Sequence, residues 1–198
     1  MRLCKLLVLL IGVASMCFQV GIAAPQGRIY LDMTNLGKAW DDYTTNPNKD
    51  TALKLYELLP PGKGAQEVEL QVDVRDNIFS KLNILESQIY GGERNALKVA
   101  FRLFGIADSE MKKALVKIIG YLLRFDTKLF LEELLIHETL VPDLGQLVCS
   151  FQLSSPDDKI QQELERNIRL KSLGYIEDKE LKDIKKKCIK ILKELKIQ

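Results

Sequence analysis

A repeat of aspartates at a fixed spacing is the feature that most constrains the fold of this chain. Asp108, Asp143 and Asp178 are thirty-five residues apart, and each precedes a stretch whose apolar residues follow helical spacing. The segments DSEMKKALVKIIGYL and DKELKDIKKKCIKIL, which begin at the first and third of these aspartates, share acidic, apolar and lysine positions in register. A fixed period of this length indicates helical hairpins that stack on one another.

Residues 1–23 have the pattern of an export signal. Arg2 and Lys5 give it a positive start, and residues 6–15 form its apolar run. The small side chain of Ala23 fits the position before a cleavage site, so we expect cleavage after Ala23. Cleavage directs the mature protein to the bacterial periplasm or to the outside of the cell. The alternative is a signal that is retained as a membrane anchor.

Charge and length exclude several classes of protein. The chain has 29 basic residues (Lys and Arg) and 27 acidic ones, a formal net charge of +2. Cleavage would remove Arg2 and Lys5 and leave a net charge of zero, so no global positive surface for nucleic acid is expected. A mature chain of about 175 residues is long enough for one domain with its own core. No later apolar run is long enough to cross a bilayer, so no transmembrane span is expected after cleavage.

Cys149 and Cys188 are the two cysteines outside the expected signal. Export permits a disulfide between them. Each falls in a helix that follows a spaced aspartate, at offsets that differ by about 6 Å along the helix axis. Because helix axes lie roughly 8–10 Å apart, the total separation exceeds the Cα limit of about 7 Å for a disulfide. The sequence therefore leaves two alternatives, a bridge or two buried free thiols.

The mature chain divides into two parts. Residues 24–92 form an expected N-terminal helical cap or degenerate repeats, and residues 93–198 carry the thirty-five-residue period. Residues 66–74 alternate between apolar and polar side chains, as strands do. Because no second strand exists to pair with them, we interpret them as an extended linker or as the frayed start of the next helix. Apolar spacing and helix breakers predict helices at residues 29–44, 52–59, 77–90, 93–104, 109–124, 128–138, 144–153, 157–172 and 179–197.

Several residues are suited to cap these helices. Asp108, Asp143 and Asp178 each stand where a carboxylate can accept the free N–H groups of a helix N-terminus. The alternative for these aspartates is a metal or ligand site, which we consider less favoured because no other ligands stand nearby in the sequence. Ser155 is the expected N-cap of the helix that follows it. Gly105 is the expected left-handed residue after the helix at 93–104.

The residues that follow the aspartates occupy corresponding positions in the three copies. In the first copy they are Met111, Lys112, Ala114, Ile118, Ile119, Gly120 and Leu122. In the third copy they are Leu181, Lys182, Ile184, Cys188 and Leu192, with Lys190 in place of the glycine. The middle copy keeps Asp143, Cys149 and Leu153, with Leu147 in place of the basic residue. This order of aspartate, apolar, basic and small positions resembles the second helix of a HEAT/armadillo repeat.

The resemblance covers residues 93–198 and implies an all-α fold. That fold is a short α-solenoid of antiparallel helical hairpins with an N-terminal helical cap, and the alternative is an irregular helical bundle. Proteins of this class mostly serve as scaffolds that bind other proteins, so the resemblance implies an exported, non-enzymatic protein that binds a protein or peptide. Stacking places the expected binding surface on the exposed face of the helices after the aspartates, at Lys113, Lys117, Tyr121, Gln152 and Lys187.

The sequence has no recognisable catalytic motif. His137 is the single histidine, and it lies near a predicted helix C-terminus, where the helix dipole favours an imidazolium ion. Cys149 and Cys188 are too far apart for CxxC redox chemistry. Residues 61–64, PGKG, lack the leading glycine and the Ser/Thr of a P-loop. We therefore expect no enzyme activity, no cofactor and no metal site.

Two other functions remain as alternatives. An enzyme or small-ligand-binding protein would use a pocket between the N-terminal helices and the repeats, and the first residues to examine are Trp40, Asp41, Tyr43 and Tyr56. Weak contact with a membrane surface would use the lysines of residues 179–197. The apolar stripe of that segment can instead dock on the preceding hairpin. This stripe comprises Ile184, Cys188, Ile191, Leu192 and Leu195.

Overall fold

The computed structural model describes residues 32–61, 70–153, 155 and 158–197. The all-α class is confirmed for these residues, which form ten α-helices and a short 3-10 helix and contain no strand. In chain order the elements are α1 (Met33–Thr45), α2 (Lys49–Leu58), α3 (Val72–Ser80), α4 (Leu82–Tyr90), α5 (Arg94–Leu103), α6 (Ser109–Phe125), α7 (Thr127–His137), η2 (Glu138–Leu140), α8 (Leu144–Val148), α9 (Lys159–Gly174) and α10 (Lys182–Glu194). The expected export signal and its cleavage site lie outside the described residues, and so does most of the segment 66–74.

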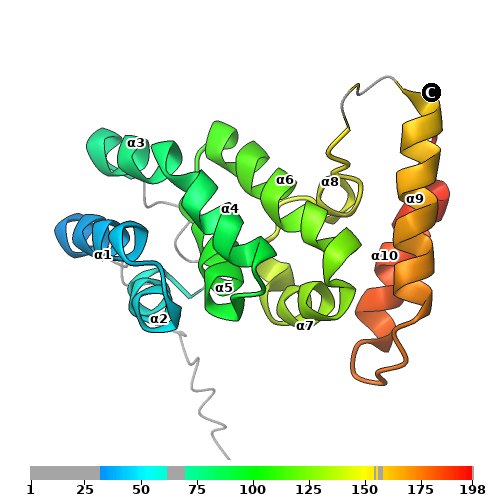
Figure 1. The fold of residues 1–198 in the computed structure, drawn as a ribbon, viewed down its shortest axis with the longest axis horizontal. Coiled ribbons are helices and arrows are strands. Elements are labelled where there is room, and N and C mark those ends of the chain that lie inside the picture. Colours follow the sequence, from blue (N-terminus) through cyan, green and yellow to red (C-terminus); the bar gives the residue numbers. More distant parts are fainter. Residues whose placement is uncertain (1–31, 62–69, 154, 156–157, 198) are drawn as a thin grey trace, which may run out of the picture.

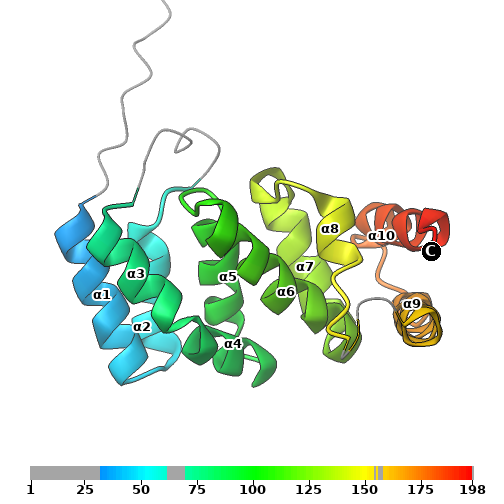
Figure 2. The same ribbon diagram turned by 90° about the horizontal axis from the view of Figure 1, so that it is seen from above.

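The helices follow one another along an elongated molecule, with α1 and α2 at one end and α9 and α10 at the other (Figures 1 and 2). Near one end, α2 packs on both α1 and α5. In the middle, α6 packs on α4, α5, α7 and α8. At the far end, α10 packs on α7, α8 and α9. The buried apolar side chains form one continuous cluster along this row, so the first and last helices are joined through their neighbours.

Helix α1 confirms the amphipathic pattern that predicted it. Leu36, Trp40 and Tyr43 follow helical spacing and are fully buried. Helix α2 begins slightly earlier than predicted because Asn48 provides an N-cap. The Asn48 side chain accepts hydrogen bonds from the backbone N–H of Asp50 (2.9 Å) and of Thr51 (3.1 Å). This arrangement satisfies two of the free N–H groups at the helix start.

The predicted helix at 77–90 is two helices, α3 and α4, which meet at Lys81. Helix α3 begins at Val72, so the end of the alternating segment is helical rather than extended. Val74 and Ile78 face the core from α3, while Val72 is exposed. The alternation therefore did not mark a strand at Val72 and Val74, and the interpretation of a helix start is correct for these two residues.

Two of the three spaced aspartates are confirmed as N-caps. The Asp108 carboxylate accepts from the N–H of Met111 (2.8 Å), and the Asp143 carboxylate accepts from the N–H of Gln146 (3.0 Å). The prediction is wrong for Asp178, which accepts from Glu180 N–H in a turn that precedes α10. This turn carries the buried side chain Leu181 into the core, so the regular helix begins only at the next residue.

The other two cap predictions are also wrong. Gly105 is not left-handed, because the only described residue with a positive φ is Gly92, at 86°. The chain leaves α5 through a tight turn that buries Phe104 and Ile106, and such a turn needs no left-handed residue. The N-cap of α9 is Asp158 rather than Ser155, and its carboxylate accepts from Gln161 N–H at 3.0 Å.

Helix α8 is much shorter than the predicted 144–153, and its surroundings explain why. A Cβ added to Gly120 of α6 would lie 2.8 Å from the Cβ of Ser150 and closer still to the carbonyl oxygen of Leu147. The two backbones are therefore in direct contact. The guanidinium of Arg169 donates to the carbonyl oxygens of Val148 (2.9 Å) and Ser150 (2.8 Å). These bonds satisfy carbonyls at the end of α8 and allow the helix to stop there.

Candidate interaction surface

Three aromatic rings meet on the surface where α4 ends beside α6. Tyr121 lies 5.7 Å from Tyr90 and 4.7 Å from Phe125, measured between ring centroids. We call Tyr90, Tyr121 and Phe125 the aromatic cluster. Phe125 is 60% exposed, and the two tyrosines are half-buried. Exposed aromatic side chains that pack against one another are typical of the centres of protein interfaces.

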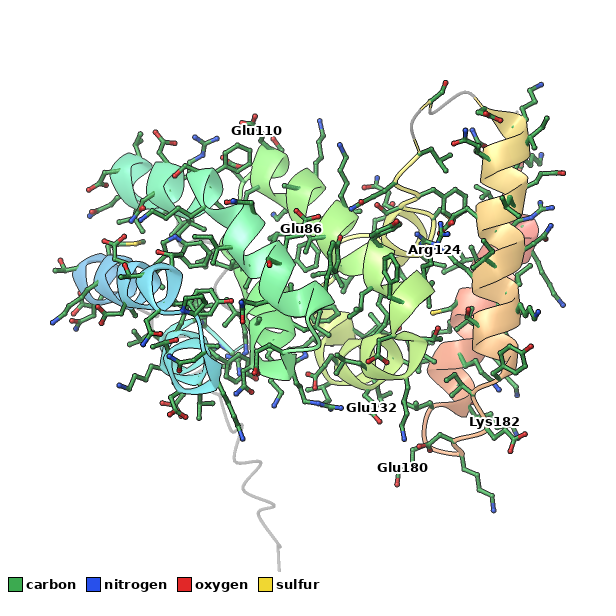
Figure 3. All side chains as sticks on the ribbon, viewed as in Figure 1. Glu86, Glu110, Arg124, Glu132, Glu180 and Lys182 are labelled. Carbon is green, nitrogen blue, oxygen red and sulfur yellow. The ribbon has the colours of Figure 1, made fainter. Side chains whose placement is uncertain are left out.

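Hydrogen bonds hold Tyr90 in this position. Its hydroxyl donates to the carbonyl oxygen of Ile118 (3.2 Å) and accepts from the side-chain amide of Gln152 (3.0 Å). Burial raises the pKa of Tyr90, and the neighbouring Glu86 carboxylate raises it further. The hydroxyl is therefore neutral at ordinary pH. Glu86 lies on α4 where that helix crosses α6 (Figure 3).

Arg124 lies at the edge of the aromatic cluster, between the end of α6 and α9 (Figure 3). Its guanidinium is 6.0 Å from the centroid of the Phe125 ring. It also forms an ion pair with Glu165 of α9 at 2.6 Å. Helix α9 therefore holds the Arg124 side chain beside the Phe125 ring, which gives this edge of the aromatic cluster a defined shape.

The structure brings four of the five predicted binding residues to this surface. Lys113, Lys117 and Tyr121 follow one another at intervals of one helical turn along α6, and both lysines are exposed. Gln152, which follows α8, reaches the same place through its bond to Tyr90. Lys187 does not join them, because its ammonium group pairs with Glu138 of η2 at 2.6 Å.

No known protein family, curated protein sequence or solved structure matches this chain. The aromatic cluster is therefore a candidate site on the basis of its exposure and ring contacts alone. Across residues 32–61, 70–153, 155 and 158–197, no three His, Cys, Asp or Glu side chains are placed to hold a metal ion. Within the same ranges, every helix is too short or too polar to cross a membrane.

The four residues predicted to line a pocket do not converge. Trp40 and Tyr43 are fully buried core residues, and the Trp40 indole donates to the carbonyl oxygen of Asn77 at 3.3 Å. Asp41 is exposed and pairs with Lys81 at 2.8 Å, and hydrogen bonds from Lys81 and Asn77 lower the pKa of Asp41. An open groove of about 280 Å³ lies between α1 and α3, with Asp41 on its wall. Trp40 and Tyr43 do not line this groove.

Tyr56, the fourth of these residues, belongs to a buried network around His137. The His137 ring stacks on Phe101, with 5.2 Å between centroids, and is almost fully buried. Arg102 donates to the Tyr56 hydroxyl at 2.9 Å, which leaves that hydroxyl to donate to His137 Nε2 at 3.4 Å. His137 Nδ1 then carries the proton and donates to the carbonyl oxygen of Glu133 at 2.9 Å.

The prediction of a charged imidazolium at His137 is wrong. Burial lowers the pKa of His137, and the positive charges of Arg102 and Lys98 lower it further. The last carbonyl groups of α7 do not offset this cost of desolvation, because the ring lies inside the core rather than at its surface. The ring is a neutral core side chain whose two nitrogens are both hydrogen-bonded.

His137→Gln is expected to change how stability depends on pH. Because the folded-state pKa of His137 lies below its unfolded value of about 6.5, folding favours the neutral ring, and its contribution to stability is lost as the pH falls below about 6.5. Between about pH 7.5 and about pH 5.5, the native chain should lose up to about 1.4 kcal/mol relative to His137→Gln. Urea unfolding at several pH values measures this difference.

Glu133 also makes stability depend on pH, so the native chain must be compared with His137→Gln at each pH. Burial raises the pKa of Glu133, although Lys98 and Arg94 oppose the shift, so the Glu133 contribution to stability grows as the pH falls. Its sign is opposite to that of His137. Glu133 is present in both proteins, so the part of its effect that does not depend on His137 cancels in the difference. A difference that does not vary with pH would contradict a buried, neutral His137.

Neither cysteine has the properties of a reactive thiol. Cys149 is half-buried, Cys188 is buried, and both are free. Burial raises the pKa of Cys188 to about 12 and also raises the pKa of Cys149. Both groups are therefore protonated at ordinary pH, and a protonated thiol is a poor nucleophile.

The apolar stripe of α10 packs against the rest of the protein. Ile184, Cys188 and Leu192 are buried, and α10 contacts α7, α8 and α9. The stripe is thus not free to enter a membrane. The remaining basis for membrane contact is the charge of the exposed lysines of α10, and such lysines are also expected on the solvated face of a terminal helix.

Proposed function

We propose that this protein is an exported, non-enzymatic scaffold that binds a protein or peptide through the aromatic cluster and the adjacent residues of α6. The observation that carries the proposal is the exposure of Phe125 together with its contacts to two tyrosines. Large aromatic side chains supply most of the binding energy at many protein interfaces. A ring that is exposed and held in place by its neighbours loses little conformational entropy when a partner covers it.

We further propose that the helices form a short solenoid of the HEAT-like kind. The helices α6, α8 and α10 follow the three spaced aspartates, and the contacts of α6 with α8 and of α8 with α10 support a stack with this period. In such a stack each repeat touches its neighbours, and the outer faces of successive helices form one extended surface. In this arrangement Tyr121 and Phe125 of α6 and Gln152 after α8 belong to that surface, and Tyr90 of α4 lies beside them.

The charges around the aromatic cluster indicate which partner fits it. Lys113 and Lys117 extend the surface along α6 with two exposed positive charges, and no ion pair joins either to a described residue. A segment that binds here would place an apolar side chain on Phe125 and acidic residues near the lysines. Complementary charges of this kind increase the association rate and the specificity more than the affinity.

Phe125→Ala is expected to reduce capture of the partner at least about tenfold, which corresponds to about 1.4 kcal/mol of binding free energy. The variant should fold normally, because the Phe125 ring is mostly exposed. The measurement is affinity capture from the native compartment, with quantitative mass spectrometry of the proteins recovered. Lys113→Glu combined with Lys117→Glu should weaken capture of the same protein by reversing the charge beside the cluster.

Ile136→Ala is the matched control for this experiment. Ile136 is 64% exposed on α7 and lies outside the aromatic cluster, so its truncation removes a similar amount of exposed apolar surface. Capture should be unchanged in this variant. Equal recovery of every protein by the native chain and by Phe125→Ala would refute the proposed surface.

A further inference from the structure

Helix α9 buries two charged side chains and leaves two large apolar side chains exposed. Glu165 and Arg169 face the body of the protein and are buried. On the opposite face, Ile160 is 81% exposed and Leu164 is 59% exposed. Tyr175, directly after the helix, is 71% exposed and continues the same face. An ordinary amphipathic helix buries its apolar stripe, whereas α9 buries Leu173 beside this charged pair and leaves a second apolar face exposed.

The inner contacts fix the orientation of α9. Arg169 donates to Glu165 (3.0 Å) and to two carbonyl oxygens at the end of α8, and Glu165 also pairs with Arg124 of α6. Rotation of α9 to bury Ile160 and Leu164 would break the bonds of Arg169 to the end of α8 and the ion pair of Glu165 with Arg124. The outward position of the apolar side chains is therefore a fixed property of the fold. We call Ile160, Leu164 and Tyr175 the α9 stripe.

The α9 stripe lies at the end of the molecule far from α1, and no described helix beyond it covers it (Figures 1 and 2). Exposed apolar stripes of this kind mark interaction sites. The charges beside the α9 stripe indicate which kind of partner binds there. Both signs occur there, with Glu163 on one turn and Lys171 two turns later. A helix that binds an anionic membrane carries mainly lysine and arginine beside its apolar face.

The α9 stripe, taken together with Lys171, is nearly symmetric about a point close to the middle of the helix. Ile160 and Tyr175 stand at equal distances along the chain from the point between Asn167 and Ile168, and so do Leu164 and Lys171. If two copies of α9 pack in antiparallel fashion about this point, Ile160 of one copy meets Tyr175 of the other. Leu164 then packs on the aliphatic part of the other Lys171 side chain.

The charges are complementary in this arrangement. Glu163 of one copy comes beside Lys171 of the other, and the two-fold axis repeats this pair at the other end of the contact. The antiparallel helix dipoles are also favourable. We propose that two copies of this chain associate through the α9 stripe as a two-fold symmetric dimer. The contact is separate from the aromatic cluster, so each dimer presents two copies of that surface.

Sedimentation velocity of the purified full-length protein over a wide concentration range tests this proposal. The expected result is a reversible shift from the mass of the monomer to twice that mass as the concentration rises. Leu164→Glu should remain a monomer throughout. Leu135→Glu, at an exposed apolar position on α7, should dimerise like the native chain. A native chain that is monomeric at all concentrations would overturn the proposal.

A charge-reversal pair tests the partner and the orientation. Glu163→Lys alone and Lys171→Glu alone should each weaken dimerisation several-fold, because each places like charges side by side at both ends of the contact. The double variant should restore it. Two weak single variants without rescue in the double variant would overturn the antiparallel arrangement. Binding to anionic vesicles that requires Leu164, without dimerisation in solution, would assign the α9 stripe to a membrane instead.

Discussion

Arg169→Met is expected to lower the free energy of unfolding by about 3–5 kcal/mol, which is the range for breaking a buried charge network by removing one partner. The Arg169 guanidinium is fully buried and donates to Glu165, to Val148 and to Ser150. Without it, two carbonyl groups at the end of α8 lose their donors. Urea or thermal unfolding measures the loss, and the melting temperature should fall by roughly 6–20 °C.

The physical reason is that each of these groups remains buried after Arg169 is removed. Methionine has a similar length but no donor, so it restores the packing on the Phe151 ring and none of the hydrogen bonds. Glu165 keeps its ion pair with Arg124 but loses the bond on its other oxygen. The cost therefore comes from unsatisfied polar groups rather than from a cavity.

Arg166→Met on the same helix is the control. Arg166 is partly exposed and forms an ion pair with the exposed Glu163 at 3.7 Å, a weak surface pair. Such pairs contribute about 0–1 kcal/mol, so this variant should unfold almost like the native chain. If both substitutions cost the same, Arg169 does not hold α8 and α9 together.

The sequence predicted a helix well where the residues that determine it lie within that helix or directly before it. The spacing of Leu36, Trp40 and Tyr43 predicted α1, and the carboxylates of Asp108 and Asp143 predicted the starts of α6 and α8. These features depend on residues within one or two turns of each other. The sequence failed where a distant residue decides the outcome.

Helix α8 is the clearest such failure. Its early end depends on Arg169, which lies 21 residues beyond Val148 in the chain. The same limit applies to His137, whose pKa is lowered by burial and by the positive charge of Arg102, a residue distant in the chain. A local pattern contains neither interaction. For this reason the helix dipole, which is a local effect, gave the wrong charge for His137.

The candidate surface was predicted in part for the same reason. Lys113, Lys117 and Tyr121 lie on one face of one helix, so helical spacing was enough to group them. Tyr90 and Phe125 were missed. Tyr90 reaches Gln152 across 62 residues of sequence, and Phe125 ends the apolar run of α6 like an ordinary core residue. Only the packing of α4 beside α6 shows that these rings form one exposed group.

Gly120→Ala is expected to destabilise the protein by about 1–3 kcal/mol or more, the range for forcing extra atoms into a packed interior. The new methyl group would lie 2.8 Å from the Cβ of Ser150 and even closer to the carbonyl oxygen of Leu147. The second of these atoms belongs to the backbone and cannot rotate away, so α8 must move off α6. Chemical denaturation measures the effect as a lower midpoint with an unchanged slope.

Gly37→Ala is the matched control, because Gly37 also lies inside a helix. A Cβ there would meet only Val74 at 3.8 Å, an ordinary contact distance. Removing a glycine from the interior of α1 should then stabilise the protein by about 0.5–1 kcal/mol, since alanine favours the helix. The two substitutions are chemically identical and have opposite predicted signs. If Gly120→Ala were also stabilising, the backbones of α6 and α8 would not be in contact. The close packing of the two helices that follow Asp108 and Asp143 would then be absent.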